Sequence, residues 1–141
     1  MNDQVVLRDT ILHALREAAG ACNALAGFIL EAANHLRAGE IRAGNELLSQ
    51  ILDDFSQLVS FLEDVRRTKA FVEEGRQPSI DALDRESQEM ADLLNMAVDA
   101  QENQDWVFLA DILEYEFSQK VGSWDGLLRG LSDPVGARAA L

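Results

Sequence analysis

The sequence predicts an all-α protein, folded as an antiparallel four-helix bundle whose long first and second helices carry heptad patterns. Apolar residues recur at alternating spacings of four and three along residues 3–37 and again along 40–65. That spacing aligns one face of an α-helix. Only Ala38 and Gly39 separate the two patterned stretches, so the two helices must pack antiparallel as a hairpin.

The first two helices each show one apolar stripe that we expect to face the core. The first stripe consists of Ile11, Leu15, Ala18, Cys22, Leu25, Ile29, Ala32 and Leu36. The second consists of Ile41, Gly44, Leu48, Ile51, Phe55, Leu58, Leu62 and Val65. Because Cys22 lies on the first stripe, we interpret it as a small buried hydrophobic residue and not as a reactive thiol.

A strip of small residues, Gly20, Ala24 and Gly27, lies beside the first stripe. Glycine inside a helix costs about 1 kcal/mol relative to alanine. Two glycines on one face therefore predict the close approach of another helix. That helix belongs either to this chain or to a second subunit, and we expect a homodimer contact.

The third helix is predicted from about Ile80 to Glu102, after a loop over residues 73–78 and with Ser79 as its N-cap. Its weaker stripe consists of Ile80, Leu83, Met90, Leu94 and Ala97. Asn103 or Asp105 is expected to cap the fourth helix. These helices form one domain over residues 1–131, and residues 132–141 are expected to be a frayed tail.

The fourth helix, around residues 104–124, holds both tryptophans and the single tyrosine. At about 100° per residue, one face carries its core stripe, which consists of Trp106, Leu113, Phe117, Val121 and Trp124. Phe108, Ile112 and Tyr115 fall on the opposite side, where an apolar patch predicts a contact with another protein. With the neighbouring Glu116, these three residues are the predicted partner-binding site.

The string Asp105-Trp106-Val107-Phe108-Leu109-Ala110-Asp111-Ile112-Leu113-Glu114-Tyr115-Glu116 contains a recognisable signature. It resembles a family of small uncharacterised bacterial helical proteins, whose pattern is acid-aromatic-Val-x-Leu-Ala-Asp-x-Leu-Glu-Tyr-Glu followed by a tryptophan. The resemblance covers about twenty residues. It implies a helical fold and a link to motility genes, with no assigned activity.

Charge and composition exclude several classes of function. The chain has 25 acidic and 12 basic residues, a net charge of −13, which argues against a nucleic-acid or anionic-membrane partner. Residues 79–103 hold seven acids and one base, which suits a basic partner. With one cysteine, no signal peptide and no apolar run near the roughly 18 residues of a membrane span, we expect a cytoplasmic protein.

No catalytic, metal or cofactor motif is expected. A di-metal bundle needs Glu-x-x-His pairs, and neither His13 nor His35 has a glutamate three residues before it. The segment from His35 to Gly39 resembles the His-x-Leu-Lys-Gly motif of histidine phosphotransfer domains, although the leucine follows the histidine directly. Glu116, in apolar surroundings, is either an acid–base group or a partner of Lys120, Arg66 or Arg67.

The expected function is therefore that of a non-catalytic protein interaction module, an adaptor, small regulator or export- or motility-type chaperone. We expect it to bind a basic amphipathic helix of a partner. The alternatives are a phosphotransfer domain that uses His35 and an enzyme that uses Glu116.

Overall fold

The computed structural model describes residues 3–132, with the side chain of residue 4 excepted. Within this range the chain is helical and contains no strand, so the prediction of an all-α protein is confirmed. The elements are α1 (Asp3–Arg37), α2 (Ile41–Arg67), α3 (Lys69–Val72), α4 (Gln77–Glu102), α5 (Trp106–Ile112), the π-helical segment η1 (Leu113–Phe117) and α6 (Ser118–Ser132).

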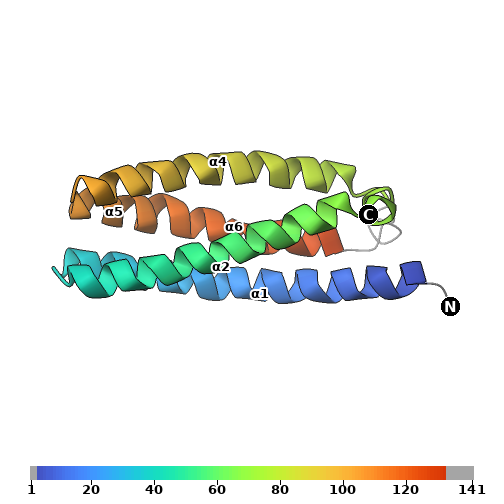
Figure 1. The fold of residues 1–141 in the computed structure, drawn as a ribbon, viewed down its shortest axis with the longest axis horizontal. Coiled ribbons are helices and arrows are strands. Elements are labelled where there is room, and N and C mark those ends of the chain that lie inside the picture. Colours follow the sequence, from blue (N-terminus) through green and yellow to red (C-terminus); the bar gives the residue numbers. More distant parts are fainter. Residues whose placement is uncertain (1–2, 133–141) are drawn as a thin grey trace.

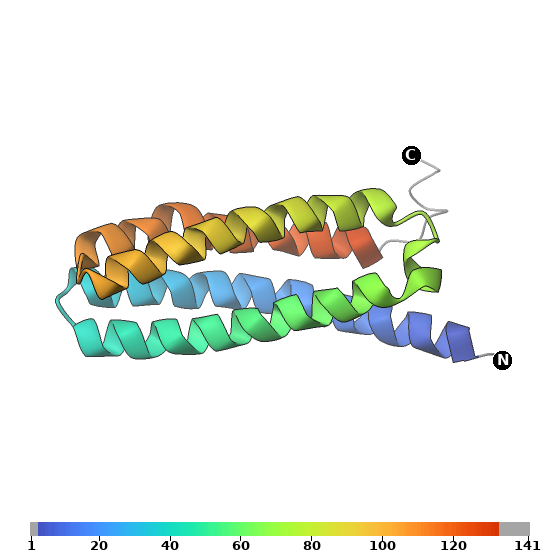
Figure 2. The same cartoon turned by 45° about the horizontal axis from the view of Figure 1, so that its top comes forward.

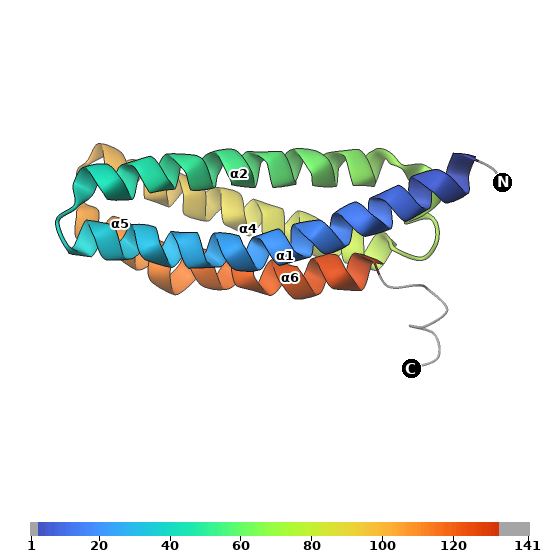
Figure 3. The same ribbon diagram turned by 90° about the horizontal axis from the view of Figure 1, so that it is seen from below.

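Four long rods lie along a common direction: α1, α2, α4 and the continuous rod formed by α5, η1 and α6 (Figures 1 and 2). After its turn the chain returns as α2 beside α1, and Figure 3 shows α6 lying along the other side of α1. α1 makes its most extensive contacts with α6 and α2, and α4 packs on α5 and α6.

The turn between α1 and α2 closes where the sequence predicts it. Gly39 has a φ of 80°, a left-handed conformation that glycine adopts without strain. The Gly39 amide donates to the Leu36 carbonyl at 3.2 Å, and the Glu40 amide donates to the His35 carbonyl at 2.8 Å. This pair of hydrogen bonds is a Schellman motif, which ends α1 and turns the chain back.

α4 begins earlier than predicted. It starts at Gln77, so Pro78 lies in its first turn and Ser79 lies inside the helix instead of capping it. The preceding Arg76 is buried, and its Nε donates to the Leu131 carbonyl near the end of α6 at 2.9 Å. The sequence predicts a loop around Arg76, and the Arg76 hydrogen bond connects this part of the chain to the last turn of α6.

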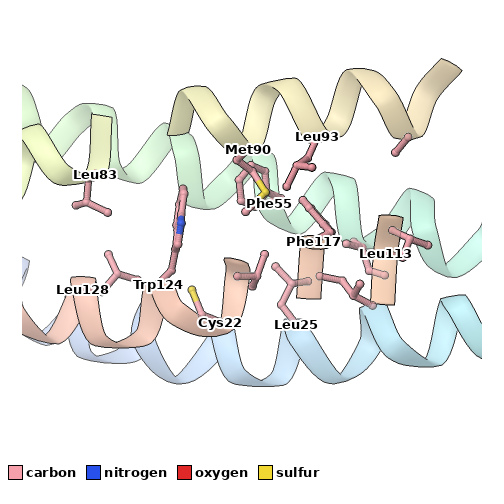
Figure 4. Close-up of a cluster of buried hydrophobic side chains, with 14 of the residues drawn as sticks. Cys22, Leu25, Phe55, Leu83, Met90, Leu93, Leu113, Phe117, Trp124 and Leu128 are labelled. Carbon is pink, nitrogen blue, oxygen red and sulfur yellow. The ribbon is translucent and has the colours of Figure 1, made fainter. Parts of the chain in front are cut away.

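The core runs between the four rods (Figure 4). Phe55 of α2 reaches across to the fourth rod, with its ring centroid 5.9 Å from that of Phe117 and 5.5 Å from that of Trp124. The predicted α1 stripe is buried except for Ala18, which is half-buried. On α2, five of the eight stripe residues are buried, and Ile41, Leu58 and Leu62 are half-buried.

The fourth rod changes its helical twist at η1, and this corrects the prediction for Ile112. A π-helical turn holds more residues than an α-helical turn, so η1 acts as an insertion that rotates α5 relative to α6. The rotation brings Ile112 into the core, where it is only 3% exposed, and leaves Trp106 half-buried. The prediction assumed a constant 100° per residue across this segment.

α6 extends beyond the predicted fourth helix and ends at Ser132. Leu128 and Leu131 are completely buried against the core, and Leu127 is half-buried. The prediction that a frayed tail begins at residue 132 is wrong for that residue, because Ser132 is the buried last residue of α6. The other residues of that tail lie outside the described range.

Candidate functional site

The residues of the predicted partner-binding site do not share one surface. Phe108 and Tyr115 are 44% and 58% exposed, whereas Ile112 belongs to the core. Ile112→Lys would place a charge in the core, so this variant should unfold the protein. Without Ile112, the apolar patch expected on this rod is reduced to separate exposed side chains.

Tyr115 lies beside an ion-pair cluster that joins the end of α1 to the fourth rod. The Arg37 guanidinium lies 3.1 Å from an Asp111 oxygen and 3.2 Å from a Glu114 oxygen. The same guanidinium lies 5.8 Å from the centre of the Tyr115 ring, within range of a cation–π contact. These contacts link the π-helical segment to α1 and leave most of the Tyr115 ring in solvent.

Glu116 is exposed, and none of the three predicted bases is its partner among the described residues. The Lys120 ammonium lies between Glu89 and Glu86 of α4, and its hydrogen bonds to these two carboxylates raise its pKa. Arg66 pairs with Asp84 at 2.8 Å. Glu116 instead borders a shallow hollow between α4 and the fourth rod, together with acidic Glu89 and Asp92.

His35 lies at the end of α1 with a carboxylate on each side. Its Nδ1 is 3.3 Å from Glu40 and its Nε2 is 3.9 Å from Glu31. His13 likewise contacts Glu17 at 3.1 Å, so both histidines lie beside glutamates. No group of three or more metal-ligating side chains lies together within the part of the chain that the structure describes.

An apolar hollow lies between α1 and α2, on the side of this hairpin that faces solvent. It has a volume of about 510 Å³. We name it the α1/α2 groove and define it by its lining residues, which are Ala14, Glu17, Ala18, Ala21, Cys22, Ala24, Leu25, Phe28, Asp54, Gln57, Leu58 and Phe61.

Small side chains on α1 make this groove. The α1 wall carries alanines at positions where larger apolar residues would fill the space, and Ala21 and Ala24 are exposed to solvent. Phe28 is 46% exposed on the same wall, and Phe61 is half-buried on the α2 wall. The alanines were visible in the sequence, but their distance from a second wall was not.

The small-residue strip divides between two environments. Ala24 lines the α1/α2 groove. A Cβ atom added at Gly20 or Gly27 would meet nothing within 4 Å, so neither glycine serves close packing within the described chain. Of the two alternatives that the sequence left open, close packing of Gly20 and Gly27 on another helix within residues 3–132 is therefore excluded, and a second subunit stays a prediction.

Residues 13–126 match a known family, described as a domain of unknown function, over most of the 141-residue chain. The chain belongs to the DUF8042 family. This membership agrees with the resemblance to an uncharacterised helical family, while the short signature and the bacterial origin stay predictions. No curated protein and no solved structure matches the chain.

The matched range contains the whole α1/α2 groove, from Ala14 to Phe61, together with η1. The groove is therefore part of the family domain and not of a segment added to it. None of the helices in the described range is long and apolar enough to span a membrane.

Proposed function

We propose that this chain is an antiparallel four-helix bundle that acts as a non-catalytic protein interaction module in the cytoplasm. In this proposal the α1/α2 groove binds one amphipathic helix of a partner protein. The observation that most directly supports this proposal is the solvent-facing groove of about 510 Å³ with alanines along its α1 wall. Such a module serves as an adaptor, a small regulator or an export- or motility-type chaperone.

The dimensions of the groove suit a helix. Its α1 wall extends from Ala14 to Phe28, which at 1.5 Å per residue is about 20 Å, or four helical turns. An amphipathic helix binds a hydrophobic groove by burying apolar side chains spaced three and four residues apart. Alanines on the groove wall allow such a helix to approach closely, and the Phe28 ring offers exposed apolar area for it to cover.

The two alternative functions have weaker support from the geometry. A phosphotransfer reaction at His35 would occur between two carboxylates, whose negative charge opposes an incoming phosphoryl group. An enzyme based on Glu116 would need a second catalytic group, and the one base among the described residues that line the hollow beside it, Lys120, is already paired with Glu86 and Glu89. A helix-binding groove requires neither feature.

The proposal is tested by adding charge to the groove without changing the core. Ala21→Arg with Ala24→Arg places two large, positively charged side chains on the α1 wall at exposed positions, so the fold should be retained. Asn23→Arg adds charge to an exposed position of the same helix that does not line the groove. Affinity purification from the source cells, followed by mass spectrometry, should recover a partner with the wild type and with Asn23→Arg.

The groove double variant should lose that partner while its circular dichroism spectrum stays helical. Recovery of the same partner by the folded double variant would show that binding uses another surface. Circular dichroism of all three proteins separates lost binding from lost folding.

A homodimer is a second candidate arrangement, favoured by the open space around Gly20 and Gly27. In this arrangement the strip formed by Gly20, Ala24 and Gly27 packs against the same strip of a second copy. Multi-angle light scattering should then give twice the 15.6 kDa chain mass, and Gly27→Arg should restore the monomer. A monomeric wild type at high micromolar concentration would exclude this contact.

A further inference from the structure

The α1/α2 groove carries one acidic side chain on each wall. Glu17 lies on the α1 wall and Asp54 on the α2 wall, and among the described residues no lysine, arginine or histidine lines the groove. The remaining lining residues are apolar except for Gln57. The groove is thus an apolar channel with a negative charge along each side.

The two acids lie at different heights along the groove. Glu17 and Phe61 are equally far along the chain from Gly39, and so are Ala24 and Asp54. Because the hairpin turns at Gly39, Glu17 lies level with Phe61, and Asp54 lies level with Ala24. The seven positions from Glu17 to Ala24 correspond to about 10 Å, or two helical turns.

Both carboxylates are available to a partner. Asp54 is exposed and makes no ion pair with any residue in the described range. Glu17 contacts His13 at 3.1 Å, but both side chains are more than 70% exposed. Such a surface ion pair contributes little to the free energy of folding. Glu17 can therefore exchange His13 for a basic group of a partner.

We infer that the partner helix carries a basic residue on each flank of its apolar stripe, about two turns apart, and that these residues pair with Glu17 and Asp54. This inference rests on the proposed function and specifies the chemistry of its partner. A second copy of this chain is a less favourable occupant of the groove than a basic helix, because each copy has a net charge of −13. Like charge on both partners opposes docking, whereas a basic helix is attracted.

Three synthetic helical peptides of about 18 residues test this inference on the full-length protein. All three share one leucine-rich stripe and differ only at the positions that flank it, which are lysine, glutamine or glutamate. Fluorescence anisotropy of the labelled peptides at low salt gives each Kd. We expect the lysine peptide to bind at least about tenfold more tightly than the glutamine peptide, and the glutamate peptide to bind most weakly.

Variants of the protein assign this preference to the two acids. Glu17→Gln with Asp54→Asn should reduce the lysine preference to about twofold. Asp99→Asn with Glu102→Gln removes the same net charge from exposed positions near the end of α4, and it should leave most of the preference intact. All positions are exposed, so circular dichroism should show every variant folded.

The outcomes separate the two proposals. Equal binding of the lysine and glutamine peptides would overturn the charge inference and leave the groove as a helix site. An equal loss of preference in both double variants would also overturn it, because the attraction would then come from overall charge. No binding by any peptide, or binding unaffected by Ala21→Arg with Ala24→Arg, would overturn the proposed function itself.

Discussion

Glycines in this chain have opposite roles that depend on their neighbours. A Cβ atom added at Gly44 would lie 2.7 Å from Cδ2 of Leu36, so Gly44 allows α2 to approach α1 just after their turn. Gly20 and Gly27, in contrast, have open space around them. The close approach that the sequence assigned to Gly20 and Gly27 occurs within this chain at Gly44.

Alanine substitutions should therefore have effects of opposite sign at Gly44 and Gly20. Gly44→Ala should lower the free energy of unfolding by about 1–3 kcal/mol, because Leu36 must leave its packed position. Gly20→Ala should raise it by up to about 1 kcal/mol, because alanine favours the helix. Urea unfolding of the two variants measures both values, and a stabilised Gly44→Ala protein would contradict the close contact.

Cys22 makes the stability of the protein depend on alkaline pH. Burial, followed by the negative charge of Asp125, raises the pKa of its thiol from 9.0 to about 11. As the pH rises from about 9 to about 11, the unfolded chain loses this proton first, so unfolding becomes easier. The stability that the protonated thiol provides is present below pH 9 and is lost as the pH rises.

Cys22→Ala removes this titration. Lys120, whose pKa is also raised, makes stability fall in the same direction, so the comparison must be made between the two proteins. The free energy of unfolding of the wild type should fall more steeply between pH 9 and 11 than that of Cys22→Ala. Parallel curves from urea unfolding would show that the thiol titrates alike in both states.

At the scale of elements, η1 keeps the two halves of the fourth rod facing the core. Leu109, Ile112 and Leu113 are buried before or at its start, and Phe117, Val121 and Trp124 are buried at its end and beyond. A regular α-helix does not place both sets on one face, because the spacing between them contains one residue too many. The π-helical turn absorbs that residue, and the exposed Tyr115 and Glu116 lie within it.

Deletion of Glu116 should therefore be tolerated. The segment then becomes a regular α-helix that keeps both buried sets on one side, so the free energy of unfolding should change by less than about 1 kcal/mol. Deletion of Ser123, another exposed residue of the same rod, should cost more than about 4 kcal/mol, because it leaves Phe117 and Val121 out of register with Trp124.

Circular dichroism and urea unfolding of the two deletion proteins distinguish these effects. Equal destabilisation by both deletions would mean that the π-helical turn has a role beyond register. It would direct attention to the Arg37 contacts with Asp111 and Glu114, which meet the rod at this segment.

At the scale of the whole molecule, negative charge is the dominant surface property. The net charge of −13 produces self-repulsion that the ion pairs at Lys120 and Arg66 offset only locally. Salt screens this repulsion, because the Debye length falls from about 30 Å at 0.01 M to about 8 Å at 0.15 M. The same screening weakens attraction to a basic partner helix.

Raising sodium chloride from 10 to about 300 mM should therefore have two opposite effects. The thermal midpoint of the free protein, followed by circular dichroism, should rise by a few degrees. The affinity for a lysine-flanked helical peptide should fall in the same series. A thermal midpoint that falls with salt would show that attractive ion pairs outweigh the repulsion.

The sequence by itself determined the helical fold and much of the core. The apolar stripes with helical spacing on the first two helices indicate which faces are buried. The glycine between these helices indicates where the chain reverses. Stripe residues such as Ile29, Ile51 and Phe55 are buried as the spacing requires. Local spacing suffices here because α1 and α2 are regular along their length.

The tertiary structure alone decided the position of Ile112, the role of Arg76 and the presence of the α1/α2 groove. A helical wheel assumes a constant twist, and the π-helical turn becomes favourable only when both halves of the rod pack on the same core. Arg76 gains its buried hydrogen bond only because the end of α6 lies beside it. The groove exists because alanines on α1 lie beside a second wall on α2, and the distance between two walls is not a property of either helix alone.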